Sequence, residues 1–187
     1  MDFESQQELQ RELGPGERLL WTGRPRQGLR LRAADALMIP FSVMWGGFAV
    51  FWEVGVLRQG GPTFFALWGI PFLVVAVYIT VGRFFFDSYQ RSRTYYGLTD
   101  QRAIIRTSKG VKSLSLRGLA DLSLKERGDR SGTISFGAAD PRYALFAGAG
   151  WPGMGRFVPP SFEMIEDARQ VYTQIRDAQR TSERIGA

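Results

Sequence analysis

The sequence contains no cysteine and no histidine. The first absence excludes disulfide bonds, thiolate catalysis and any zinc site with cysteine ligands. The second removes the commonest general base and the commonest metal ligand. The chain also lacks the G-x-S-x-G, H-E-x-x-H, P-loop and Rossmann fingerprints. We therefore expect the protein not to be an enzyme and to bind no cofactor or metal.

Acidic residues are fewer than basic ones: 18 Asp and Glu stand against 24 Lys and Arg, which gives a net charge of +6. A basic chain is attracted to nucleic acids and to anionic membranes. No helix-turn-helix, zinc finger or interleaved aromatic and basic motif is present. We therefore do not expect nucleic acid to be a partner.

Two apolar runs occupy the middle of the chain, and the only charged residue of the first is Glu53, while residues 63–82 contain none. Each run has about 20 residues, the length needed to cross a hydrocarbon core of about 30 Å. Neither has the polar stripe of a surface helix. The sequence predicts two transmembrane helices, 36–57 and 63–84, in a hairpin region at 35–86. The alternative is a soluble protein with two very apolar core helices.

The connection between the runs is Arg-Gln-Gly-Gly-Pro, residues 58–62. So short a turn forces an antiparallel hairpin and places both chain ends on one side. Basic residues flank the hairpin, whereas the turn holds only Arg58. The positive-inside rule then predicts a multi-pass protein of the cell (inner) membrane with both termini in the cytoplasm. The flanking arginines are Arg24, Arg26, Arg30 and Arg32 on one side and Arg83, Arg91 and Arg93 on the other.

Glu53 supports two interpretations. An ionisable residue inside a membrane helix often has a transport or proton-transfer role. Glu53 lies near the outer end of its helix, however, so we prefer an interfacial anchor that reaches the headgroups and pairs with Arg58. A transport role stays open as a small oligomeric membrane transporter or membrane enzyme component, since two helices enclose a pathway only in a homo-oligomer.

Residues 1–34 form a polar cytoplasmic and juxtamembrane segment. Within it, residues 16–25 (GERLLWTGRP) have the composition of a docking or interfacial segment. The arginines between 24 and 32 set the orientation of the hairpin. They also offer contacts to an anionic leaflet, worth roughly 1 kcal/mol for each basic residue.

From Thr94 the spacing of apolar residues changes to two, which is typical of antiparallel strands with one buried face. Asp100-Gln101 is a tight turn between strands at 94–99 and 102–107. Frequent turns and short strands predict a barrel or sandwich. Further strands are expected at 111–116, 119–127 and 133–136, with one or two short ones around 143–146 and 155–158.

A helix is predicted at 162–184, with Ser161 as its N-cap. Apolar residues at spacings of three and four form one stripe on this helix. We expect the stripe to close one end of the barrel, which completes a cytoplasmic domain at 88–187. The stripe consists of Phe162, Ile165, Ala168, Tyr172 and Ile175.

Three segments resemble a known family. Residues 96–105 (YGLTDQRAII) resemble the Y-x-L-T-(D/N)-x-R-hydrophobic hairpin of bacterial pleckstrin-homology-like (PH-like) membrane proteins. Residues 162–168 (FEMIEDA) resemble the F-x-x-I-x-D-A helix start of that family, and residues 16–25 resemble the segment that often precedes its membrane hairpin.

The resemblance implies an α+β membrane protein: a two-helix transmembrane hairpin followed by a PH-like antiparallel barrel or sandwich with a C-terminal helix as its cap. It implies a membrane-anchored interaction module that binds a protein partner or anionic lipid headgroups. Its equivalents of the family's basic contact residues are Arg106, Lys109 and Lys112. The acidic Asp100 in the first strand loop argues against a phosphoinositide pocket.

Overall fold

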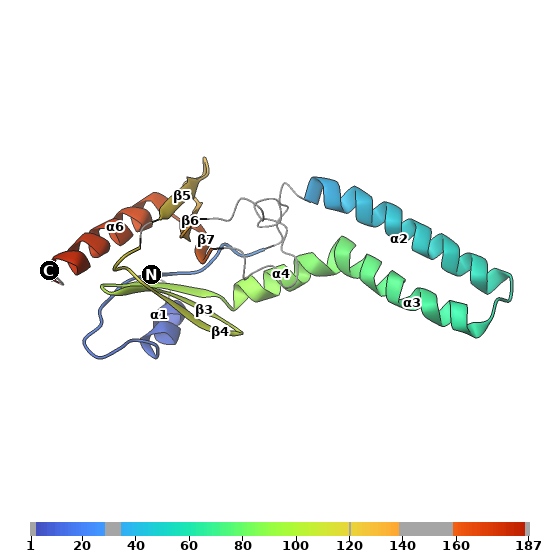
Figure 1. Ribbon diagram of the computed structural model, residues 1–187, viewed down its shortest axis with the longest axis horizontal. Coiled ribbons are helices and arrows are strands. Elements are labelled where there is room, and N and C mark those ends of the chain that lie inside the picture. The colour runs from blue at the N-terminus through green and yellow to red at the C-terminus, as the bar shows by residue number, and fades with distance from the viewer. Residues whose placement is uncertain (1–2, 29–34, 120, 139–158, 186–187) are drawn as a thin grey trace.

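The computed structural model describes residues 3–28, 35–119, 121–138 and 159–185. It is an elongated α+β molecule with a helical hairpin at one end and two antiparallel sheets at the other (Figure 1). The strands expected around 143–146 and 155–158 lie outside the described residues.

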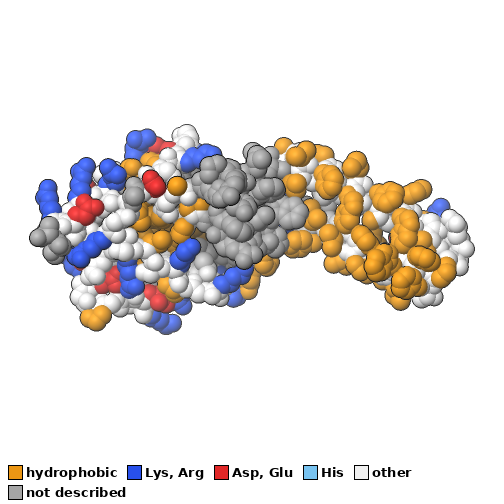
Figure 2. All heavy atoms as spheres, in the orientation of Figure 1, with side chains coloured by type: hydrophobic (Ala, Val, Ile, Leu, Met, Phe, Trp, Pro, Cys, Tyr) orange, Lys and Arg blue, Asp and Glu red, His pale blue; other side chains and the backbone are white. Residues whose placement is uncertain are grey.

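The hairpin consists of α2 (Asp35–Arg58) and α3 (Thr63–Val77). A π-helical turn, η1 (Tyr78–Gly82), continues α3 into α4 (Arg83–Ser92). The two continuous helical rods, Asp35–Arg58 and Thr63–Ser92, are each long and apolar enough to cross a membrane. Only 17% of the most apolar stretch of the first rod and 11% of that of the second are buried. Figure 2 shows their hydrophobic side chains gathered on the outer surface of the hairpin, with charged side chains over the rest of the molecule.

The second rod ends eight residues later than the sequence predicted, at Ser92 instead of residue 84. The apolar run stops at Gly82, but α4 continues as an amphipathic helix. Its last turn buries Arg91 against the chain that follows β1. A buried polar contact, which hydropathy does not detect, therefore extends the helix to the edge of the sheet.

The first sheet has the order β1-β2-β3-β4, and all its strands are antiparallel. The predicted turn at Asp100-Gln101 is confirmed, because β2 ends at Thr99 and β3 begins at Arg102. The strands are β1 (Leu19–Gly23), β2 (Tyr95–Thr99), β3 (Arg102–Thr107) and β4 (Gly110–Ser115).

β1 comes from the segment before the hairpin, which the sequence had marked only as a docking segment. Trp21 lies opposite Leu98, and Thr22 lies opposite Gly97. Helix α1 (Phe3–Gln10) covers these strands, and its Leu9 is fully buried close to Gly97. The hairpin is thus an insertion between the first two strands of one sheet.

The second sheet has the order β5-β6-β7 and is followed by α6 (Ala168–Ile185). Its strands are β5 (Leu122–Glu126), β6 (Gly132–Phe136) and β7 (Ser161–Ile165). The sequence predicted a helix from residue 162, and this prediction is wrong for residues 162–167. Residues 161–165 are a strand, and the helix begins only after Asp167.

A bulge explains why β7 has a helical spacing. Phe162 pairs with Ile134 and Ile165 pairs with Gly132, so three steps along β7 match two steps along β6. The extra residue turns Phe162 and Ile165 toward the same buried side. A spacing of three, which normally indicates a helix, arises here from an irregular strand.

The two sheets and α6 share one hydrophobic core. Phe162 lies at its centre, with its ring 5.6 Å from that of Trp21, 4.9 Å from Tyr96 and 4.8 Å from Phe136. Within the described residues, no strand pair joins the two sheets into a closed barrel. The α+β class, the apolar hairpin and the antiparallel sheets are as predicted.

Candidate functional site

Two of the basic residues predicted to contact a ligand are used inside the domain. Arg24 pairs with Glu4 at 2.8 Å and lies over the ring of Tyr95. Arg106 pairs with Glu8 at 2.8 Å and with Glu12 at 3.2 Å, so it attaches α1 to the sheet. Both arginines are largely neutralised by these carboxylates.

Arg26 is half-exposed and pairs with Asp129 in the loop before β6. The Ser131 hydroxyl and the Arg26 guanidinium lower the pKa of Asp129 to about 2. The backbone N–H of Arg26 donates to the carbonyl of Met164 at 3.0 Å. Arg26 therefore connects the two sheets. Arg30 and Arg32, two further predicted contacts, lie outside the described residues.

Lys109 and Lys112 are exposed, as a contact surface requires. Strand β2 begins at Tyr95, three residues after α4 ends, and Tyr95 pairs with Arg106 in β3. The turn at Ser108–Lys109 comes after Arg106, so it extends beyond the start of β2 and toward α4. This turn lies on the side of the sheet from which α4 emerges (Figure 1). Among the predicted contact residues that the structure describes, these two lysines are exposed and lie near the hairpin.

A buried arginine joins the hairpin to the sheets. The Nη2 of Arg91 donates to the Gly28 carbonyl at 2.8 Å, and its Nη1 donates to the Arg26 carbonyl at 3.2 Å. It also pairs with Asp87 one turn earlier in α4 at 3.0 Å. Sequence reasoning treated Arg91 only as an orientation signal. No local pattern marks it as a clamp, because its acceptors are carbonyl groups more than sixty residues away.

A second ion pair joins the two helices at the end of the hairpin nearest the sheets. Arg83 at the start of α4 pairs with Asp35 at the start of α2 at 2.7 Å. Both side chains are largely buried. The pair fixes the separation of the two rods at the point where the apolar surface begins.

A buried carboxylate holds β1, β2 and β3 in register. Glu17, just before β1, accepts bonds from Arg102 Nε and Nη2, each at 2.8 Å, from the Thr99 hydroxyl at 2.7 Å and from the Gly14 N–H at 2.7 Å. The hydrogen bonds from Arg102, which outweigh the effect of burial, lower the pKa of Glu17 from 4.5 to about 2. Arg102 thus acts as a structural residue.

This network predicts a pH-dependent stability. The pKa of Glu17 is lower in the folded chain, so its contribution is complete above about pH 4.5 and is lost as the pH falls toward 2. The shift corresponds to a contribution on the order of 3 kcal/mol at neutral pH. We expect Glu17→Gln to lower the thermal unfolding midpoint of the detergent-solubilised chain at pH 7 and to flatten its decline between pH 5 and 3. Glu166→Gln, which changes an exposed carboxylate, should leave both unchanged.

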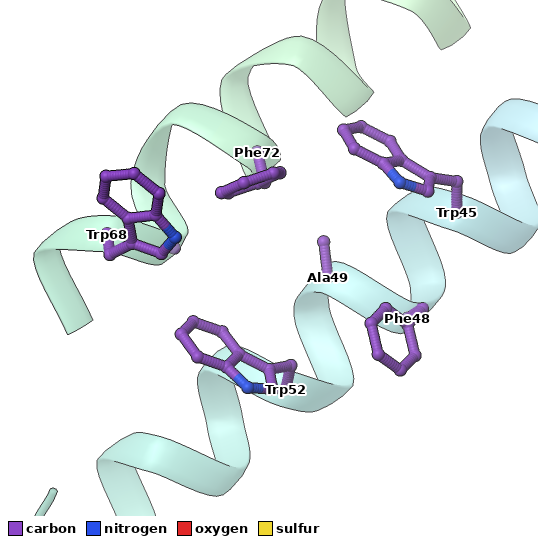
Figure 3. A pocket seen from close by; sticks show the side chains of 7 residues that line it. Trp45, Phe48, Ala49, Trp52, Trp68 and Phe72 are labelled. Carbon is purple, nitrogen blue, oxygen red and sulfur yellow. The ribbon is translucent and has the colours of Figure 1, made fainter. Parts of the chain in front are cut away.

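Aromatic side chains line a groove of about 250 Å³ between α2 and α3 (Figure 3). Trp45 and Phe72 lie 6.0 Å apart across the two helices, and Trp68 lies 6.1 Å from Phe72 on α3. The complete lining is Trp45, Phe48, Ala49, Trp52, Trp68, Gly69 and Phe72.

The structure corrects our interpretation of Glu53. Its side chain does not reach outward to Arg58 but is buried between the helices, with 9% of the residue exposed. The carboxylate lies against Gly69, where a Cβ atom would overlap it. Its Oε2 atom has no hydrogen-bond partner among the described residues. Arg58 is exposed at the turn.

No protein-family model, curated protein or solved structure matches the chain. The geometry is therefore the basis for assigning a function. It places two distinct features on the molecule: a lysine-bearing turn beside α4, and an aromatic groove with a buried carboxylate inside the apolar hairpin. In the part of the chain that the structure describes, no group of three acidic side chains is arranged to hold a metal ion.

Proposed function

We propose that this protein is a membrane-anchored interaction module, with a PH-like domain held at the cytoplasmic face of the membrane by the inserted hairpin. The observation that carries the proposal is the exposed apolar surface of α2 and α3. Exposing so many large apolar side chains to water is unfavourable, and a bilayer removes this cost. A hairpin inserted between β1 and β2 also anchors the domain at two points.

The charges at the two ends of the hairpin support this orientation. The turn holds Arg58, whereas Arg83, Arg91 and Arg93 lie on the side of the sheets. The exposed Lys109 and Lys112 lie on the same side, and their positive charge supports a contact with anionic headgroups. The Arg91 clamp would hold the domain in one orientation, so that the β3–β4 turn faces the leaflet.

Alkaline carbonate extraction tests the anchoring. We expect the full chain to stay with the membrane pellet, and a reporter enzyme fused to the C-terminus to be active only in the cytoplasm. Release of the chain into the carbonate supernatant, or a reporter active outside the cell, would contradict the proposal.

Charge reversal tests the contact with headgroups. We expect Lys109→Glu with Lys112→Glu to raise the accessibility of the β3–β4 turn to a soluble protease in vesicles containing phosphatidylglycerol. Each lysine is worth about 1 kcal/mol at an anionic surface, so loss of the pair costs about 2 kcal/mol and should change the accessibility by roughly thirtyfold or more. Arg180→Glu with Arg184→Glu is the matched control, because α6 extends away from the hairpin (Figure 1). Equal effects of the two pairs would argue against a lysine contact.

A further inference from the structure

An acidic group that the hairpin does not compensate lies behind Gly69, beside the groove between α2 and α3. Glu53 lies against Gly69, one of the lining residues, and its Oε2 atom has no partner among the described residues. From residue 36 to residue 82 the only basic side chain is Arg58. It lies five residues further along α2, about 7.5 Å at 1.5 Å per residue, and is exposed. An ionised carboxylate in apolar surroundings is costly, and a positive charge beside it offsets much of this cost.

The walls of the groove favour one kind of positive charge. Faces of tryptophan and phenylalanine rings attract cations, most strongly where water is excluded. A metal ion needs several oxygen ligands, whereas the groove lining contributes aromatic rings, Ala49 and Gly69 beside a single carboxylate. The chemistry therefore fits an organic ammonium, whose charge is spread over carbon groups that can lie against the rings.

The depth of the groove favours a free molecule over a lipid headgroup. Trp45, at its inner end, is thirteen residues from the turn residue Arg58, which corresponds to about 20 Å along α2. The ammonium group of a lipid stays near the membrane surface, so it would leave the inner half of the groove empty. A second copy of the hairpin inserted in the same direction would add apolar side chains and no cation at the depth of Glu53.

We propose that this groove binds a small organic cation, an alkyl- or arylammonium, whose charge pairs with Glu53 while its apolar part lies between Trp52 and Trp68. This site rests on the proposed function, because it requires the hairpin to be in a bilayer. Gly69 is the positioning residue: its lack of a side chain leaves room for the carboxylate.

Binding is tested with the full chain in phosphatidylglycerol vesicles, which contain no amine headgroup. Benzyltrimethylammonium is titrated, and tryptophan fluorescence is followed. We expect a saturable change, and a dissociation constant for Glu53→Gln that is raised about tenfold or more, as for the loss of a charged partner. Asp177→Asn removes a carboxylate from the exposed face of α6 and should bind as the unmodified chain does. Neopentylbenzene, the uncharged analogue, should bind at least tenfold more weakly than the cation.

A glycine pair provides a second test that retains the carboxylate. Gly69→Ala adds a methyl group where the carboxylate lies and should weaken binding, whereas at Gly47 an added Cβ meets nothing within 4 Å. Gly47→Ala should therefore leave binding unchanged. Equal binding by Glu53→Gln and the unmodified chain overturns the site. Loss of the signal in vesicles of phosphatidylethanolamine also overturns it, because that result would identify the occupant as a lipid headgroup.

Carbonate extraction of the same vesicles separates this site from the proposed function. A chain that is washed off overturns both, since no groove then lies in the membrane. An inserted chain that gives no saturable signal overturns the cation site alone. If Trp68→Cys forms a complete disulfide between two copies, and the unmodified chain gives no response to the cation, a second copy fills the groove and the site is also overturned.

Discussion

Residues 88–187 alone are expected to be unfolded, whereas residues 3–28 joined to 88–187 by about ten Gly and Ser residues are expected to form a folded, soluble domain. The difference arises because β1 and α1, both before the hairpin, complete the first sheet. The linker is long enough, because the Gly28 carbonyl lies 2.8 Å from Arg91 and a flexible chain of ten residues spans about 17 Å.

The expected loss is as large as the stability of an ordinary domain. Leu9 is fully buried, and Leu20 and Trp21 pack against the core. Full burial of a large apolar side chain contributes about 1.5–3 kcal/mol, while a domain is stable by only about 5–15 kcal/mol. Removing β1 also turns the central strand β2 into an unpaired edge, which promotes aggregation.

Far-UV circular dichroism and urea unfolding distinguish the outcomes. The linked domain should show a single cooperative transition, and residues 88–187 should show none. Trp21→Ala in the linked domain is an intermediate case that keeps the strand but removes its largest side chain. A cooperative transition of residues 88–187 at the same urea concentration as the linked domain would show that β1 adds little.

Patterns within a few residues predicted most of the fold correctly. The apolar runs predicted α2 and α3, the alternation after Thr94 predicted the strands, and Asp100-Gln101 predicted the turn between β2 and β3. Each of these signals is local, since neighbouring residues determine both the element and its exposed face. The same holds for Ile134 and Phe136, which share the buried side of β6.

β1 was missed because its signal is not local. Its three apolar residues Leu19, Leu20 and Trp21 show no alternation, and its partner strand begins 76 residues later than β1 itself. The burial of Glu53 was missed for a related reason. Its environment depends on how α2 is rotated against α3. Gly69 contacts the Glu53 carboxylate only because the two helices pack against each other in this way.

Contacts between residues that are distant in the sequence also determine the roles of the basic residues, and local patterns do not predict these contacts. The sequence predicted Arg106 and Lys109 as possible contacts to a ligand and treated Arg91 as an orientation signal. Their actual roles depend on distant carboxylates and carbonyl groups: Glu8 and Glu12 neutralise Arg106, and the carbonyl of Gly28 accepts from Arg91. Among the predicted contact residues that the structure describes, Lys109 is exposed because the β3–β4 turn that carries it extends into solvent.

Phe162→Ala is expected to destabilise the linked domain by about 3–5 kcal/mol, the cost of a large cavity in a core. Phe162 is fully buried and is the residue at which both sheets meet, through Trp21 and Tyr96 on one side and Phe136 on the other. Phe162→Leu keeps most of the volume and should cost much less. Val111→Ala, at an exposed position of β4, is the control and should leave the urea midpoint unchanged.

The size of this effect also tests the bulged strand β7. In the strand, the extra residue at the bulge turns Phe162 into the core together with Ile165. If residues 161–165 were instead the first turn of a helix, Phe162 would lie at the end of the helix, where truncation costs little. A loss below about 1 kcal/mol would therefore argue against the strand, since an exposed side chain buries little apolar area. A loss in the expected range means that three-residue spacing can arise from a bulge.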